Sequence, residues 1–130
     1  MDKISGIPVF CSFREERQTE DLLIHSKSPY IHSQTQATTL ARVIKSNGWR
    51  NSIVVSDRDN KTIVKGRLLY ETAIAQEWES VPVEYQSYSS IGEEIADMVA
   101  DNKVTSMSEI DNFILGDVME HLNDIGGDIL

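Results

Sequence analysis

The apolar residues of this chain occur in short segments whose spacing changes repeatedly from that of a strand to that of a helix. Alternating or β-branched segments at 4–13, 53–55, 62–64 and 81–85 predict strands, and the polar segment 15–21 is expected to be a turn. Apolar residues three and four positions apart predict helices that begin near positions 35, 67, 90 and 108. This order predicts a mixed α/β fold in which a small sheet is packed with helices.

Capping and turn residues mark the boundaries of these segments. Ser33 or Thr35 is expected to cap the first helix, and Gly48 is expected to end it. The turn at 57–60 joins two strand segments, so a β-hairpin is predicted there. Pro82 lacks a backbone N–H and predicts that its half-buried strand lies at an edge of the sheet or begins there.

Three later segments carry a predicted helical core face. The helix after residue 67 is expected to bury Leu69, Ala73 and Ile74. The capping-box pattern Ser90-x-x-Glu93 predicts a helix with these inward residues: Ile91, Ile95, Met98 and Val99. A last helix is predicted from near Ser108 to the glycine pair at 126–127, with these inward residues: Ile110, Phe113, Ile114, Val118 and Leu122.

Length and cysteine content limit the class of protein. The 130 residues suit a single domain spanning 1–130. The single cysteine, Cys11, excludes an internal disulfide framework and a multi-cysteine zinc site. Because no apolar run reaches the roughly 18 residues that span a bilayer, no membrane contact is expected. The low cysteine content favours a reduced, cytoplasmic location.

The charge of the chain is strongly uneven. The net charge is −9, and residues 91–130 account for all of it, with ten acidic side chains against Lys103. The sequence therefore predicts an acidic C-terminal helical tail, which is suited to binding a protein partner rather than phosphates. By contrast, residues 42–67 hold seven basic and two acidic side chains, an excess of 7 − 2 = +5 that could bind an anion or form an ordinary solvated surface.

The most informative point is the segment Lys65-Gly66-Arg67, where a predicted strand leads directly into a predicted helix. A helix N-terminus carries unpaired N–H groups and a partial positive charge. Glycine permits close approach of the backbone to a ligand, and arginine can bind a phosphate in a two-pronged manner. These residues predict a phosphate site, although a plain glycine turn with surface charges has the same pattern.

Several segments, in order, resemble the ParB/sulfiredoxin superfamily. The resemblance is greatest to the short ParB-like domains of phages and mobile elements that accompany DNA methyltransferases. The similar segments are the leader 23–32, the helix 36–49, the strand 51–56, the turn 63–68, the strand 81–83 and Val99-Ala100-Asp101-Asn102-Lys103. The resemblance covers about residues 18–128. It implies a core at about 18–104 and a helical extension at about 105–130.

The resemblance implies a site for a nucleotide, CTP as in partition proteins or ATP as in sulfiredoxin, with Mg²⁺. Lys65, Gly66 and Arg67 would bind the phosphates. Asp101 and Asn102 would hold the metal, with Asn102 also near phosphate and Asp101 as the candidate catalytic residue. On spacing alone, helix C-capping is the better explanation of the pair. Compared with the family, the turn lacks a histidine and a second glycine, which implies weak or absent nucleotide hydrolase or nuclease activity.

Two histidines, His25 and His32, lie seven positions apart around Pro29. Imidazoles at this spacing could reach a phosphate or a metal, although isolated histidines are more often structural. His121 lies far away on the predicted acidic helix.

Three functions remain open from the sequence. The first is a ParB-like accessory module, related to plasmid partition, that binds a nucleotide or nucleic-acid phosphate and engages DNA weakly or binds a protein partner or a second copy of itself. The second is a metal-dependent enzyme of phosphate chemistry, such as a nuclease, nucleotidase or kinase. The third is a non-catalytic scaffold that acts only through protein contacts.

Overall fold

The computed structural model describes residues 2–28 and 33–107, with residues 101–107 described by their backbone alone. In chain order the elements are β1 (Lys3–Ile4), β2 (Ile7–Pro8), β3 (Glu15–Gln18), the 3-10 helix η1 (Thr19–Asp21), β4 (Leu23–Ile24), α1 (Gln34–Asn47), β5 (Ile53–Ser56), β6 (Thr62–Lys65), α2 (Arg67–Ala75), β7 (Ser80–Gln86) and α3 (Ile91–Met107). The predicted mixed α/β class is confirmed. The helix predicted from Ser108 and the rest of the acidic tail lie outside the described residues.

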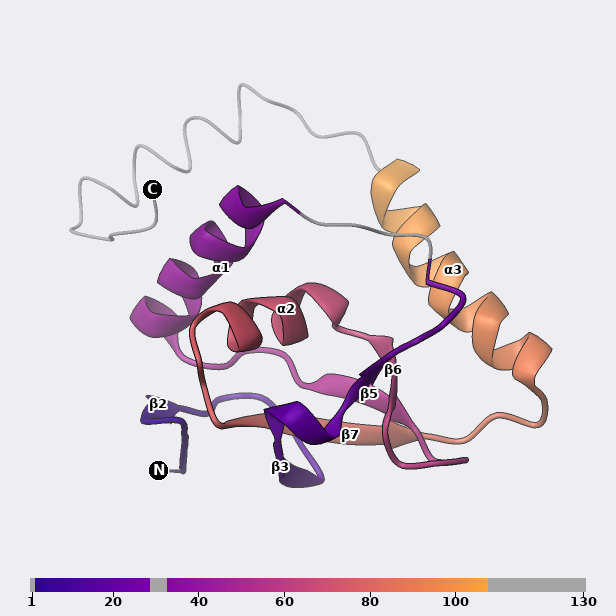
Figure 1. Ribbon diagram of the computed structural model, residues 1–130, viewed down its shortest axis with the longest axis horizontal. Helices are drawn as coiled ribbons and strands as arrows, with labels where there is room; N and C mark the ends of the chain where they lie inside the picture. The colour runs from indigo at the N-terminus through magenta and orange to yellow at the C-terminus, as the bar shows by residue number, and fades with distance from the viewer. Residues whose placement is uncertain (1, 29–32, 108–130) are drawn as a thin grey trace.

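Five strands form one mixed sheet in the order β3-β7-β5-β6-β4. The pairs β5–β7 and β4–β6 are parallel, whereas β3–β7 and β5–β6 are antiparallel. The β5–β6 pair is the predicted hairpin. Figure 1 shows α2 between α1 and the strands, and α3 standing beside the β6 side of the sheet. The sheet therefore has helices packed on it at two separate places.

The core lies between the sheet, α2 and the N-terminal hairpin β1–β2. Its fully buried members include Trp49, Ile53 and Val83. The rings of Trp49 and Trp78 meet edge to face with centroids 5.3 Å apart. Trp49 also donates its indole N–H to the carbonyl oxygen of Ile4, 3.1 Å away, which ties the N-terminal hairpin to the end of α1. A buried tryptophan normally finds such a partner, because an unmet N–H in the core is costly.

The ends of α1 follow the sequence prediction. Ser33 caps the helix, and its hydroxyl accepts the N–H of Gln36 while the Gln36 side chain accepts the N–H of Ser33. Gly48 ends the helix with φ 81° and ψ 179°, a backbone conformation that is almost restricted to glycine. Apolar residues of α1 face inward at the predicted helical spacing, and Ala37, Ala41 and Ile44 are buried.

The N-terminal predictions are wrong in detail. Residues 4–13 do not form one strand, because Ser5 and Gly6 both have positive φ and turn the chain into the β1–β2 hairpin. Residues 15–21 are not a turn but form β3 and η1. β3 forms an end of the sheet and is largely exposed, so it needs no apolar alternation and gives no strand signal.

The prediction for Pro82 is also wrong. β7 pairs with strands on both sides, and Pro82 is fully buried. Pairing with β5 begins one residue later, at the Ile53–Val83 pair. The missing N–H of Pro82 therefore lies just before the parallel pairing begins, where a central strand can tolerate proline.

Two helices are rotated relative to the predicted core faces. In α2, Ile74 is 47% exposed while Thr72 is fully buried beside Ala73. In α3, Ile91 is 50% exposed while Glu94 is fully buried near Met98. Among the described helices, none is long and apolar enough to cross a membrane.

We predict that Gly48→Ala destabilises the fold by about 2–4 kcal/mol. The added Cβ would lie 2.6 Å from the carbonyl oxygen of Pro8 and 2.6 Å from the Phe10 ring, in a backbone conformation that alanine avoids. Chemical denaturation measures the change. Gly92→Ala is the matched control, because a Cβ there meets only Ser90 Oγ at 3.8 Å and alanine favours a helix. Equal stability of the two variants would contradict the assigned role of Gly48.

Candidate phosphate-binding site

β4 and β6 are parallel neighbours, and the last residue of β4, Ile24, lies opposite Ile63, two residues before the end of β6. The leader after β4 therefore continues toward the carboxyl end of β6. His25 follows β4 directly, and Gly66 follows β6 directly. α3 packs against β6 at the same place. The sheet therefore brings together the leader after β4, the Lys-Gly-Arg turn after β6 and one face of α3, which are 25 to 70 positions apart in the chain.

The turn at 65–67 has the geometry that the sequence predicts. Gly66 is left-handed, with φ 97° and ψ 25°, and α2 begins immediately after it. The first helical hydrogen bond runs from Tyr70 N to Gly66 O, at 3.0 Å, which leaves the N–H groups of Arg67, Leu68 and Leu69 outside the helical ladder. Gly66 offers no side chain to cap them. The turn thus presents a helix N-terminus of partial positive charge.

Gly66 is also required by packing. A Cβ on Gly66 would lie 3.2 Å from the Cα of Ile53 on β5, so the turn fits tightly against the neighbouring strand. The left-handed φ and this close contact explain the glycine without any ligand. The glycine alone is therefore weak support for a phosphate site.

Both cations of the turn already have carboxylate partners. Lys65 Nζ lies 3.5 Å from Oδ2 of Asp97 on α3. Arg67 Nε lies 2.5 Å from Oε1 of Glu71, and its other arm donates to Ser28 Oγ at 3.0 Å. The two side chains thus have different partners, one on α3 and the other on α2 and the leader. An incoming anion would compete with these carboxylates for the cations.

Asp97 has a second partner. The hydroxyl of Tyr88 donates to Asp97 Oδ2 at 2.6 Å. Burial and this hydrogen bond to a carboxylate raise the pKa of Tyr88 well above its ordinary value, so the phenol stays protonated at neutral pH. Tyr88 therefore remains a donor that orients Asp97 toward Lys65.

His25 does not face a ligand site. Its ring is buried, Nδ1 accepts the N–H of Lys27 at 3.0 Å, and Nε2 lies 3.0 Å from Oε2 of Glu94. These partners assign the proton to Nε2, which donates to the carboxylate. With both nitrogens engaged inside the protein, the predicted phosphate contact of His25 does not fit this conformation. His32 lies outside the described residues.

Glu94, which sequence analysis missed, is the centre of this buried polar cluster. Arg58 donates to it from Nε at 3.1 and 3.2 Å and from its terminal nitrogen at 3.1 Å. Burial alone would raise the pKa of Glu94, but hydrogen bonds from Ser56, Arg58 and His25 outweigh burial, and the net effect lowers the pKa. Glu94 is therefore an ionised carboxylate inside the fold, held by the leader, β5 and the hairpin turn.

A signal for this cluster exists in the sequence. Glu94 stands four positions before Met98 and therefore on the same helical face as a predicted core residue. A carboxylate within an apolar stripe indicates that a partner of opposite charge reaches it. Nothing in the sequence identifies that partner as Arg58, because the hairpin turn and α3 are 36 positions apart.

The basic stretch 42–67 is less positive in three dimensions than in sequence. Arg58 pairs with Glu94 and Asp59, Lys65 with Asp97, and Arg67 with Glu71. Arg42 and Lys61 are exposed, and the Arg50 guanidinium stacks 4.2 Å from the centroid of the Phe10 ring. Acids of α2 and α3 thus balance part of the local excess that suggested anion binding.

The predicted metal residues are only partly described. The backbone of Asp101 and Asn102 belongs to α3, and their side chains lie outside the described residues. Within the described part of the chain, no group of three His, Cys, Asp or Glu side chains could hold a metal ion.

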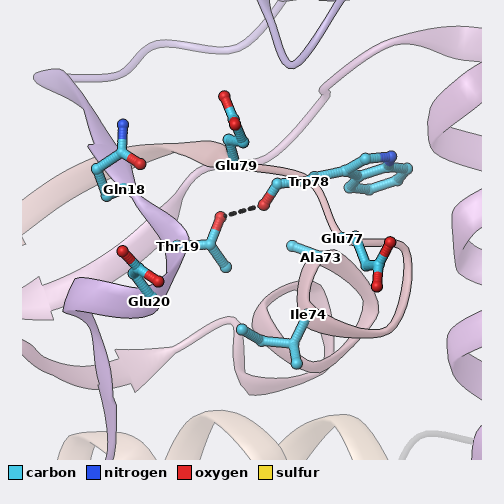
Figure 2. A pocket seen from close by; sticks show the side chains of 8 residues that line it. All are labelled: Gln18, Thr19, Glu20, Ala73, Ile74, Glu77, Trp78 and Glu79. Carbon is cyan, nitrogen blue, oxygen red and sulfur yellow. Dashed lines mark hydrogen bonds between the residues drawn. The ribbon is translucent and has the colours of Figure 1, made fainter.

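One concave region lies away from the turn. A pocket of about 270 Å³ lies between η1 and the end of α2, and no predicted site residue lines it. Figure 2 shows the Thr19 hydroxyl bound to the carbonyl oxygen of Trp78 at 2.7 Å, with Ala73 and Ile74 nearby and Glu20, Glu77 and Glu79 around them. Its carboxylates make it unsuitable for phosphate.

We predict that Glu94 makes the fold acid-sensitive. Because its pKa is lowered in the folded state, its contribution to stability is complete above the ordinary glutamate pKa and is lost as the pH falls through the lowered value. Glu94→Gln should therefore be less stable than wild type at pH 7, with the difference shrinking below about pH 4. Thermal unfolding from pH 3 to 7 measures this. A constant difference across that range would contradict an ionised Glu94.

Comparisons with known proteins bear on the fold. No family model matches the sequence, and the comparison with curated proteins finds no match. Among solved structures, the chain is similar to the C-terminally truncated chromosome-partitioning protein ParB from Caulobacter crescentus, complexed with CTP-gamma-S. The TM-score is 0.60 at 17% sequence identity, and the match covers 75% of this chain and 55% of that one. The chain thus spans little more than half the length of that ParB structure, and its fold is ParB-like.

Proposed function

We propose that this chain is a ParB-like module that binds a nucleotide through its phosphates at the turn 65–67. One observation carries the proposal: the leader that follows β4, the parallel neighbour of β6, reaches an uncapped helix N-terminus that has a cation on each side of its glycine. Ligands of α/β proteins commonly bind outside the carboxyl ends of strands. The shared fold adds support, because the ParB structure was solved with a CTP analogue.

Binding proceeds by exchange of anions. A phosphate would replace Asp97 at Lys65 and Glu71 at Arg67, while the free N–H groups of α2 bind its remaining oxygens. Each cation keeps one charge partner before and after binding. The net gain therefore comes from the higher charge of a triphosphate and from the helix N-terminus, and we expect modest affinity.

The nucleotide expected from the sequence is CTP or ATP with Mg²⁺, and the proposal keeps both. Magnesium would arrive bound to the phosphates, as it commonly does in nucleotide sites. Asp101 and Asn102 remain its predicted protein ligands. The enzyme alternative depends on Asp101 as well and has no support from the described side chains.

Engagement of DNA or of another protein extends the same proposal. Exposed cations such as Arg42 and Lys61 could give a weak, salt-sensitive contact to a nucleic-acid backbone. The acidic segment after residue 107 is the predicted surface for a protein partner or a second copy of the chain. Both ideas remain predictions from the sequence.

We predict that Arg67→Ala weakens CTP or ATP binding at least about tenfold, because a two-pronged charged contact to phosphate is lost. Lys65→Ala should weaken binding less, since a lysine is a single point charge. Isothermal titration with each nucleotide, with and without Mg²⁺, measures the affinities. Lys61→Ala, which removes an exposed charge at the opposite end of β6, is the matched control and should bind nucleotide as wild type does.

Two results would contradict the proposal. One is that no nucleotide binds to the wild-type chain at millimolar concentration. The other is that Arg67→Ala and Lys61→Ala lower the affinity equally, which would indicate a nonspecific effect of net charge.

A further inference from the structure

A continuous series of hydrogen bonds connects the buried face of α3 to Arg67. Glu94 Oε2 accepts from His25 Nε2 at 3.0 Å, and His25 Nδ1 accepts from Lys27 N at 3.0 Å. The carbonyl oxygen of His25 accepts the N–H of Ser28 at 3.0 Å. Ser28 Oγ then accepts from the Arg67 guanidinium at 3.0 Å. The first and last of these hydrogen bonds join elements that are far apart in sequence, and the two between them lie within the leader.

The early members of this series have little freedom to move. Glu94 is fully buried, and His25 is 4% exposed. Arg58 holds both carboxylate oxygens of Glu94 from the opposite side. Because Glu94 is fixed, the imidazole ring of His25 is fixed as well. Nε2 must donate to Glu94 and Nδ1 must accept from Lys27, which permits only one orientation of the ring. The ring and the carbonyl oxygen of His25 together hold the backbone of Lys27 and Ser28.

The last member, Arg67, is the one that would contact a ligand. Its guanidinium has two kinds of partner, Glu71 on its own helix and Ser28 on the leader. Glu71 is one turn along α2 and would keep Arg67 folded along the helix. Ser28 approaches from the adjacent strand end and fixes the guanidinium over the turn. Without Ser28, the long and flexible side chain of Arg67 would sample other rotamers.

We infer that Glu94 and His25 are positioning residues for the phosphate site: they fix the leader turn so that Ser28 holds Arg67 in a binding-competent orientation. This inference rests on the proposed function, and it assigns roles to two buried residues that touch no ligand. It also gives a reason for the buried pair of Glu94 and His25 beside the leader. An apolar contact could not select one ring orientation.

The first test needs no ligand. In the NMR spectrum of the wild-type chain, the side-chain Nε–H of Arg67 should give a distinct, slowly exchanging signal. Glu94→Gln replaces an acceptor with a group that presents N–H toward Arg58 or His25, so the cluster must rearrange. We expect that signal to shift or broaden in Glu94→Gln and in Ser28→Ala. Glu93→Gln is the matched control, because its carboxylate binds Ser89 at the start of α3 instead.

The second test measures coupling. Ser28→Ala and Glu94→Gln should each weaken nucleotide binding about threefold to tenfold. Because both act through the same contacts, the double variant should have the same affinity as the single variant that binds less tightly. His25→Gln and His25→Asn separate the two nitrogens, because each amide replaces only one of them. Both should behave like Glu94→Gln. Ser28→Ala lies outside the core, so it remains informative if Glu94→Gln does not fold.

The outcomes separate this inference from the proposed function. If wild type binds no nucleotide but the Arg67 signal responds to Glu94→Gln, the proposed function fails while the connection to Arg67 stands. If wild type binds and the effects of Ser28→Ala and Glu94→Gln simply multiply, the inference is overturned. It is also overturned if Glu93→Gln and Glu94→Gln change the Arg67 signal equally.

Discussion

A single ionised carboxylate, Glu94, holds together the part of the fold where the leader, the hairpin turn and α3 meet. An unpaired charge in the interior costs several kcal/mol, so the sequence must supply partners from nearby elements. Arg58 comes from the hairpin turn, Ser56 from β5 and His25 from the leader. Removing one partner leaves a buried charge, whereas a complete cluster fixes the place of all three elements relative to α3. The cluster therefore gives this region a unique geometry that apolar contacts alone would leave adjustable.

The neighbouring turn depends on a different constraint. Gly66 must be glycine because it is left-handed and lies against Ile53, and this packing directs the N-terminus of α2 toward the strand ends. Lys65 and Arg67 flank it, and each is neutralised by a carboxylate. In the proposed function, a phosphate would replace the same ion pairs that stabilise the turn. Stability and the proposed affinity would then be linked through Asp97 and Glu71.

Local signals predicted much of the fold correctly. The capping residue Ser33, the end of α1 at Gly48 and the β5–β6 hairpin all depend on chemistry within a few residues. The failures have a common cause in neighbours distant in sequence. β3 is exposed at the end of the sheet and shows no apolar pattern, and Pro82 is buried because pairing with β5 starts at Val83. The predicted roles of Asp101, Asn102 and His32 remain predictions.

The sequence by itself determined the ends of α1, the β5–β6 hairpin, the glycine turn at 66 and the uneven charge, because these follow from spacing, capping and composition. Tertiary structure decided which charges meet. In the folded chain Arg58 pairs with Glu94, and Lys65 pairs with Asp97. His25, which was predicted to contact a ligand, is instead buried and donates to Glu94. The physical reason is that electrostatic partners are chosen by distance in space. The parallel pairing of β4 with β6 sets those distances, and no local pattern encodes that pairing.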